Sequence, residues 1–200
     1  DVMVSFGADF LGTWISPSEF MAQWVTNRSN KSLQSKKMSR HIQFEAGMSN
    51  TGSNADTRIL TKPSEEGAAL INLYNEISGT TLPGSKPTGN GNIDKAIKLV
   101  AAELKAAKGK ALVVCGSNDV VKVVMENAIN SLLGSYGTTI DLDNYSNQYK
   151  GNDAEFVDFV GEMNRGEVDA VFFLNANPVY EYHNGAAIKD ALKKVRLRVS

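Results

Sequence analysis

The chain has 200 residues, of which 42% are hydrophobic and 22% are charged, and its formal net charge is −1. This is the composition of an ordinary globular protein, and the balanced charge excludes a global basic field that would attract nucleic acid or an anionic membrane. A single cysteine excludes an internal disulfide framework and an iron–sulfur cluster ligated by this chain alone, because such clusters take about four thiolates.

Residues 1–78 have the pattern of a first α/β lobe. Ser16 precedes Pro17 and is followed three residues later by Glu19, which is typical of a helix start. In chain order we expect a strand at 2–6, a loop at 7–16, a helix from Pro17, a strand at 41–45, a polar loop at 47–61 and a helix from Pro63 to Gly79.

Residues 79–92 are rich in glycine and proline and form the clearest break in the pattern. We therefore expect a linker here between a first lobe, 1–78, and a second lobe, 93–200. Hydrophobic periodicity leaves it open whether the two lobes share one sheet, so a single compact domain is the alternative.

Strands and helices alternate regularly in the second lobe. This alternation predicts right-handed crossovers and a mostly parallel, Rossmann-like sheet with helices on both faces. We expect helices at 93–108, 118–133, 153–164 and 184–194, and strands at 111–115, 138–142, 170–174 and 197–199. Inward positions are Ile93, Ile97, Val100, Ala101 and Leu104 in the first of these helices, and Phe156, Val157, Phe159 and Val160 in the third.

The loops that follow the predicted strands are the candidate ligand sites, because open parallel sheets bind ligands beyond the carboxyl ends of their strands. Besides residues 7–11, these loops contain Gly116, Ser117 and Asn118 after one strand, and Asn175 and Asn177 after another. Small residues before a helix N-terminus suit a phosphate group. The alternative is an ordinary turn in which Ser or Asn caps the helix.

Other chemistry-bearing residues do not form a recognisable site. His41 and His183 have no second histidine or cysteine at metal-ligand spacing, so we interpret both as surface or structurally bonded residues. Cys115 ends an apolar strand and is expected to be a buried hydrophobe. The sequence has neither a dinucleotide fingerprint nor a P-loop, and we predict no catalytic residue and no metal ligand.

Both ends of the chain lie inside strand-like alternations. We interpret the chain as a piece of a larger protein and expect any targeting segment to lie upstream of it. No apolar run approaches the roughly 18 residues that cross a bilayer, so we expect no direct membrane insertion.

Several longer motifs resemble one family, the large iron–sulfur subunit of bacterial alternative complex III, a variant molybdopterin oxidoreductase of a quinol-oxidising respiratory complex. The similarity runs over nearly the whole chain, and the first and third blocks are the most specific. The blocks are residues 5–14 (SFGADFLGTW) with Ser16 and Pro17, 38–40 (MSR), 50–58 (NTGSNADTR) with 62–64 (KPS), and 175–180 (NANPVY).

The resemblance implies a parent in which a molybdopterin-oxidoreductase-like half is joined to a ferredoxin-like half that carries iron–sulfur clusters. In molybdopterin enzymes, loops similar to 116–118 and 175–178 approach the guanosine diphosphate arm of the cofactor. In the complex III branch this half is a scaffold without that cofactor. The resemblance further implies cytochrome and membrane quinol-oxidising subunits as partners, and a location on the periplasmic side of the inner membrane.

We therefore hold two hypotheses for the function. The first is a scaffold domain of the respiratory subunit, without a cofactor of its own and inactive in isolation. The second is a genuine molybdopterin-dependent domain, in which Gly116, Ser117, Asn118, Asn175 and Asn177 hold the nucleotide part of a molybdopterin guanine dinucleotide. A third and weaker hypothesis is a stand-alone nucleotide-binding module. We expect no nucleic-acid partner.

Overall fold

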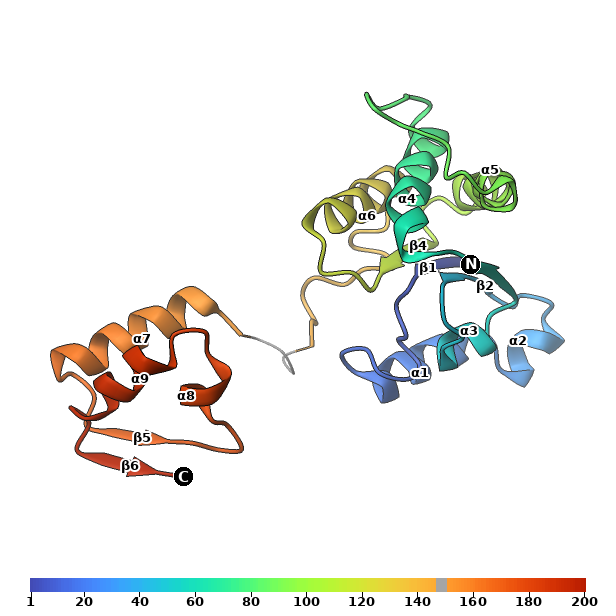
Figure 1. Ribbon diagram of the computed structural model, residues 1–200. Helices are drawn as coiled ribbons and strands as arrows, with labels where there is room; N and C mark the ends of the chain where they lie inside the picture. The colour runs from blue at the N-terminus through green and yellow to red at the C-terminus, as the bar shows by residue number, and fades with distance from the viewer. Residues whose placement is uncertain (147–150) are drawn as a thin grey trace. The chain divides into compact units, whose positions relative to one another are not determined.

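The computed structural model describes residues 1–146 and 151–200, which fall into two compact units (Figure 1). Unit 1 is Asp1–Gln148 and unit 2 is Tyr149–Ser200. Both units are built from parallel strands connected by helices, which confirms the predicted α/β class.

Unit 1 contains a four-stranded sheet in the order β3-β2-β1-β4, and every neighbouring pair is parallel. The central strand β1 (Val2–Phe6) pairs with β2 (Arg40–Glu45) on one side and with β4 (Ala111–Cys115) on the other. Strand β3 (Thr57–Leu60) pairs with β2 at one edge.

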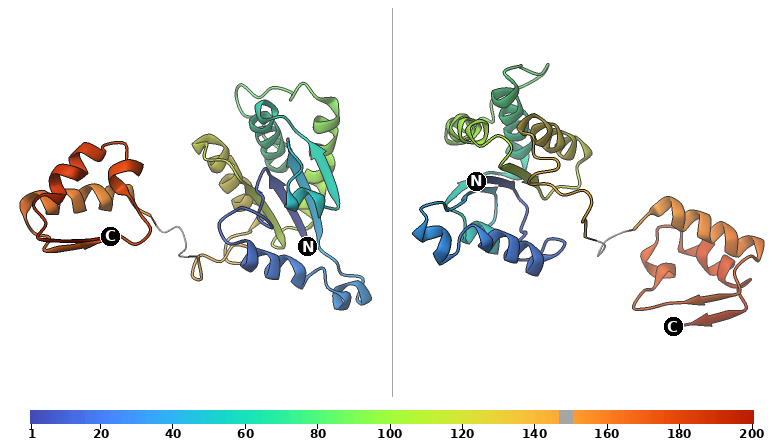
Figure 2. Two further views of the ribbon diagram at one scale, coloured as in Figure 1. Left: turned by 60° about the horizontal axis from the view of Figure 1, so that its bottom comes forward. Right: turned by 180° about the vertical axis from the view of Figure 1, so that it is seen from behind.

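Helices cover both faces of this sheet, as parallel sheets require. Figures 1 and 2 show α4 (Pro63–Ser78), α5 (Gly91–Ala106) and α6 (Val120–Leu133) on one face. On the other face lie α1 (Pro17–Thr26), α2 (Asn30–Gln34) and α3 (Asn50–Ser53). Unit 1 is therefore a three-layer structure, with the sheet in the middle.

The two faces of the sheet carry different chemistry because successive side chains of a strand point to opposite sides. The face toward α4, α5 and α6 is apolar, and at its centre the rings of Phe6 and Phe44 stack with centroids 4.6 Å apart. All five inward positions predicted for 93–108 are buried in this core. The opposite face of β1 and β2 carries a stripe of buried polar residues: Ser5, His41, Gln43 and Glu45.

The segment 79–92 does not separate two lobes, in contrast to the expected division. Strand β4 pairs with β1, and α4 packs against α5, so the chain on both sides of this segment belongs to one sheet and one core. The structure instead divides the chain between Gln148 and Tyr149. The physical reason is that β1 is a central strand and takes its second neighbour from beyond the glycine-rich segment.

Two predicted segments of unit 1 differ from the structure. Residues 47–61, expected to be a loop, contain both α3 and β3. Residues 138–142, expected to be a strand, contribute only an isolated bridge between Tyr136 and Ile140. The side chains of Ser135 and Thr139 donate hydrogen bonds to the carbonyl of Ala111 at 2.9 and 2.7 Å, so this segment contacts β4 through side chains rather than as a strand.

Asn130 completes the outer edge of β4. Its buried carboxamide accepts from the Val113 N–H at 3.0 Å and donates to the Val113 carbonyl at 2.7 Å. The side chain thus takes the place of a neighbouring strand and satisfies backbone groups that would otherwise be left unpaired at a sheet edge.

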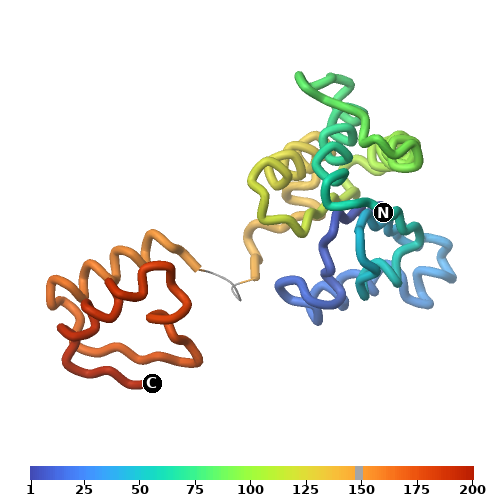
Figure 3. The backbone as a smooth tube through the Cα atoms, viewed as in Figure 1, coloured from blue at the N-terminus to red at the C-terminus, as the bar shows by residue number. Residues whose placement is uncertain are grey.

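Unit 2 is a smaller α/β structure with a two-stranded parallel sheet of β5 (Ala170–Phe172) and β6 (Leu197–Val199). Figure 3 follows the chain from β5 through α8 (Pro178–Glu181) and α9 (Gly185–Leu192) back to β6. Helix α7 (Asp153–Arg165) precedes β5 and packs against α9. The strand predicted at 170–174 is shorter in the structure, and Leu174 beyond it is 93% exposed.

The core of unit 2 is small and lies on one face of its sheet. Its buried members are Met163, Val171, Ala191 and Val195. Val157, predicted to face inward, is instead exposed, because α7 turns the side of Met163 toward the sheet. Among the residues that the structure describes, no helix is both long and apolar enough to cross a bilayer.

Candidate functional site at the carboxyl ends of the strands

The carboxyl ends of the four parallel strands of unit 1 meet at one edge of the sheet. The chain runs from β1 to β2 on one side, and from β3 to β4 on the other side of β1. The direction of winding therefore reverses between β1 and β4, and this is where doubly wound sheets hold their ligands. Gly116, Ser117 and Asn118 follow β4 at this point, as the sequence predicts.

Gly116 lies directly against the loop that follows β1. Its N–H donates to the Phe6 carbonyl at 2.9 Å. A Cβ at this position would lie 2.6 Å from the Gly7 carbonyl oxygen and 2.8 Å from the Ala8 Cα, so only glycine allows the two backbones to approach this closely. At Gly116 the loops that follow β1 and β4 are therefore in direct backbone contact.

The N-terminus of α6, the expected phosphate site, is capped by a carboxylate. Asp119 is the N-cap residue, and its side chain accepts hydrogen bonds from the N–H groups of Val121 at 2.8 Å and Lys122 at 3.4 Å. Ser117 accepts from the Asp119 N–H at 3.1 Å. The segment is thus an ordinary strand–helix turn capped by aspartate, rather than by the expected Ser or Asn. The Asp119 charge opposes a second anion here.

Asp9 connects the loop after β1 to α3. Its carboxylate accepts from the N–H and hydroxyl of Thr51 at 3.0 and 2.8 Å, and from the N–H and hydroxyl of Thr13 at 3.1 Å each. Partial burial opposes ionisation, but these hydrogen bonds outweigh it and lower the pKa of Asp9. A Cβ on Gly12 would collide with the same carboxylate.

Glu45 makes a matching connection at the end of β2. It accepts from the N–H and hydroxyl of Ser49 at 3.2 and 2.6 Å, and it forms an ion pair with Arg58 at 2.6 Å. Burial raises the pKa of Glu45, but the hydrogen bonds from Ser49 and Arg58 lower it by more. Gly52 lies against this carboxylate, where a Cβ would overlap it. Both carboxylates therefore bind the protein's own loops.

His41 continues the polar stripe on β2, away from the strand end. Its ring is 1% exposed, its Nε2 lies 3.3 Å from Gln43 Oε1, and it contacts Phe10 and Trp24. Burial is the main cause that lowers the pKa of His41, and nearby Arg28 adds to it. His41 is a structurally bonded histidine, as predicted.

Arg28 closes the outer side of this histidine site. Its guanidinium binds Asp56 through two hydrogen bonds of 2.6 and 2.8 Å and lies over the Trp24 ring at 4.6 Å. Asp56 also accepts from the His41 N–H at 2.7 Å. Sequence reasoning missed this cluster because its members are far apart in the chain.

Cys115 is buried at the end of β4, as predicted, and its environment does not suit a nucleophile. Its Sγ lies 3.7 Å from Glu66 Oε1, and burial raises its pKa to about 11. On α6, burial also raises the pKa of Glu126 to about 7, although its hydrogen bond from Asn130 works in the other direction. Among the described residues, no group of three or more His, Cys, Asp or Glu side chains could hold a metal ion.

The other two predicted site residues, Asn175 and Asn177, belong to unit 2. Asn175 has a φ of +50°, and Asn177 precedes the four-residue helix α8 without capping it through its side chain. The Asn177 N–H donates to Glu181 Oε2 at 3.3 Å. Both residues are exposed. The structure therefore divides the five predicted residues between the two units.

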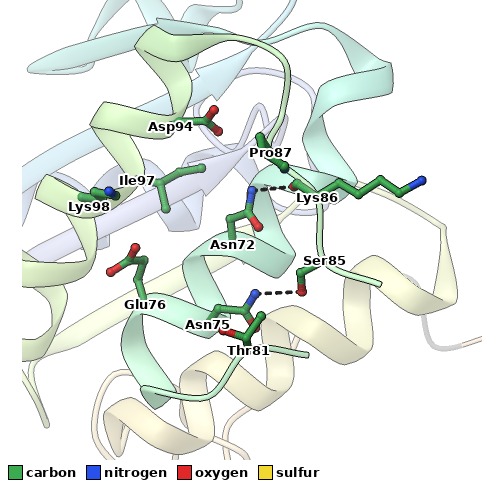
Figure 4. A pocket seen from close by; sticks show the side chains of 10 residues that line it. All are labelled: Asn72, Asn75, Glu76, Thr81, Ser85, Lys86, Pro87, Asp94, Ile97 and Lys98. Carbon is green, nitrogen blue, oxygen red and sulfur yellow. Dashed lines mark hydrogen bonds between the residues drawn. The ribbon is translucent and has the colours of Figure 1, made fainter. Parts of the chain in front are cut away.

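A surface pocket of about 400 Å³ lies elsewhere in unit 1, between α4, α5 and the segment 79–92 (Figure 4). Asn72 donates to the Lys86 carbonyl and Asn75 to the Ser85 hydroxyl, each at 2.9 Å. The pocket is lined by residues of both charges, among them Glu76 and Lys98. These contacts fasten the glycine-rich segment onto α4.

No family model matches the chain, and no curated protein matches it. The resemblance of residues 5–14 and 50–58 to the alternative complex III subunit thus stays a prediction.

Proposed function

We propose that this chain is a scaffold domain of the iron–sulfur, molybdopterin-oxidoreductase-like subunit of a quinol-oxidising respiratory complex. The observation that carries the proposal is that the strand-end loops of unit 1 bind one another. Gly116 contacts the backbone of Gly7 and Ala8, and Asp119 occupies the amides at the start of α6. Two of the first backbone N–H groups of α6, which could otherwise bind a phosphate, are thus bound by a carboxylate of the chain itself.

The motifs that carry the resemblance also have a structural role in unit 1. Residues 5–14 and 50–58 meet through Asp9 and Thr51, and Asn50 adds a hydrogen bond to the Leu11 carbonyl at 3.0 Å. These contacts give both motifs a structural role that needs no ligand, as a scaffold requires. On this proposal the iron–sulfur clusters, cytochromes and quinol site belong to other parts of the complex, on the periplasmic side of the membrane.

The second candidate is a molybdopterin-dependent domain, and the loop of unit 2 favours it. The side chains of Asn175 and Asn177 are exposed and form no hydrogen bond within the described part of the chain. Both side chains are therefore available to a nucleotide. The Ser117 hydroxyl, by contrast, accepts a hydrogen bond from the Asp119 N–H of its own loop.

Metal analysis of the parent protein distinguishes the two candidates. The parent would be purified from detergent-solubilised membranes and its iron, haem and molybdenum measured. The scaffold proposal predicts iron and haem without molybdenum. Stoichiometric molybdenum would establish the second candidate, and a preparation with neither iron nor haem would refute the scaffold proposal.

Variants of the parent add an independent test. Under the scaffold proposal, Asn118→Leu and Asn177→Leu leave metal content and quinol oxidation unchanged, because neither side chain holds a cofactor. Gly116→Ala serves as the structural comparison and lowers the yield of assembled complex, since its Cβ would meet backbone atoms. Loss of a cofactor in Asn177→Leu with normal assembly would contradict the proposal.

A further inference from the structure

Helices α1 and α2 leave an outer surface that is both apolar and cationic. Figures 1 and 2 show the two helices on the same side of the unit 1 sheet. We call this surface the α1–α2 face, and its residues are Met21, Val25, Lys31, Leu33, Lys36, Lys37 and Met38.

The apolar members of the α1–α2 face are about half exposed. The inner side of α1 is held by Phe20, which contacts Trp14, and by Trp24, which contacts His41. Met21 and Val25, one helical turn apart, are each 43% exposed. Leu33 on α2 is 52% exposed and Met38, after α2, is 45% exposed, so exposed apolar side chains also occur beyond α1.

The charge of this segment is opposite in sign to that of the whole chain. Residues 15–40 contain five cations and one carboxylate, Glu19. Two of the cations are paired, Arg28 with Asp56 and Arg40 with Glu103. The three lysines of the face form no ion pair within the described residues. The local field is therefore positive although the net charge is −1.

We propose that the α1–α2 face docks on an anionic lipid surface, with its lysines at the phosphate headgroups and its apolar side chains in the interfacial layer. Lysine suits this role because its long stem lies along apolar surface while its ammonium group stays in water. A protein partner is the weaker match, since protein interfaces are enriched in arginine and aromatic residues and depleted in lysine. The proposal rests on this face alone and not on the proposed function.

Sedimentation with lipid vesicles tests the proposal on the whole 200-residue chain. Binding is expected to phosphatidylcholine vesicles that contain phosphatidylglycerol, and not to pure phosphatidylcholine. Replacing Lys31, Lys36 and Lys37 by Gln is expected to lower the partition coefficient roughly a hundredfold, at about fivefold for each lysine. Raised salt is expected to have the same effect as the triple substitution.

Matched substitutions on α5 and just after its end provide the controls. Lys95, Lys98 and Lys108 are exposed and unpaired by any described carboxylate, so their joint replacement by Gln is expected to leave binding within about twofold. For the apolar part, Leu33→Gln is expected to weaken binding and Leu99→Gln, on α5 and 68% exposed, to leave it unchanged.

Three outcomes would overturn the proposal. They are no binding of the folded chain to anionic vesicles, equal losses in the α1–α2 and α5 variants, and binding to poly-glutamate without binding to vesicles. The last outcome would assign the face to an acidic protein instead. Circular dichroism of each variant shows that lost binding is not lost folding.

Discussion

The sheets of the two units are covered differently. In unit 1 the apolar face of the sheet is buried beneath three helices, and the opposite face holds a buried polar network beneath three more. Among the described residues of unit 2, helices cover one face of the sheet, and Phe172, Leu197 and Val199 are exposed on the other. A parallel sheet is ordinarily buried on both faces, so unit 1 is complete in this respect and unit 2 is not.

The outer edge of the unit 1 sheet is also bound by side chains. Strand β4 of unit 1 has its outer edge satisfied by the Asn130, Ser135 and Thr139 side chains. In both the edge and the strand-end loops, unit 1 uses polar side chains to bind its own backbone. The following predictions test this difference between unit 1, whose sheet is covered on both faces, and unit 2, whose sheet is covered on one.

The largest effect is expected from removing the same side chain from each sheet. Phe44 is 1% exposed and stacks on Phe6, so Phe44→Ala is expected to reduce the free energy of unfolding of unit 1 by about 4 kcal/mol. Phe172 is 69% exposed, and Phe172→Ala is expected to change the stability of unit 2 by less than about 0.5 kcal/mol. Amide hydrogen exchange measures the stability of each unit separately. Similar losses of stability in both units would contradict the proposed difference between their sheets.

A loss of about 3 kcal/mol is expected for Asn130→Ala, because the Val113 N–H and carbonyl would be buried without partners. The control is Asn127→Ala on the same helix. Its exposed side chain accepts from the Tyr136 hydroxyl and makes no other hydrogen bond within the described residues, so a loss of about 0.5 kcal/mol is expected. Denaturant unfolding gives both values. If the two variants were equally stable, the edge of β4 would not depend on Asn130.

A gain is expected for Glu126→Gln. The pKa of Glu126 is about 7 in the folded chain and near 4.5 when unfolded, so stability decreases as the pH rises through this interval. Above pH 7 the amide removes a buried charge and is expected to raise the free energy of unfolding by about 2 kcal/mol. The exposed Glu162→Gln on α7 is the control and is expected to change nothing. A Glu126→Gln variant that is no more stable than the unsubstituted chain at pH 8 would contradict the raised pKa.

The smallest effect is expected on the pH dependence of the free energy of unfolding of unit 1. Burial lowers the pKa of His41 below its ordinary value of 6.5, so the unfolded chain binds a proton more readily. The contribution of His41 to stability is therefore complete above pH 6.5 and is lost as the pH falls below it. His41→Gln is expected to flatten the slope of unit 1 stability just below pH 6.5, whereas exposed His183→Gln leaves it unchanged. An unaltered slope in the His41 variant would refute the assignment.

Much of unit 1 could be predicted from sequence because its apolar spacing is regular. The helix that contains Ile93 and Leu104, and the strands at 2–6 and 111–115, have such patterns, and the structure confirms them. Strand β3 was missed because Thr57 and Arg58 make it look like a polar loop, although the pairing with β2 decides its structure.

The position of the strand-end loops could be predicted from the sequence, but the contacts within them could not. Gly116 does follow β4 at the reversal of winding, as the alternation of strands and helices indicates. The close approach to Gly7, and the capture of Asp9 by Thr51, join residues more than 40 positions apart and leave no local signal. Asp119 could have been recognised as the cap, since aspartate before an apolar helical run is a strong N-terminal signal.

The central claim is that the strand-end loops of unit 1 are closed by contacts within the chain. The most direct test is a titration of the isotope-labelled chain with guanosine diphosphate, followed by nuclear magnetic resonance at the amides of residues 7–13 and 116–119. The account predicts no saturable shift at these amides. Saturable shifts centred on Gly116 and Ser117 would show that the loops bind a nucleotide and would contradict the account.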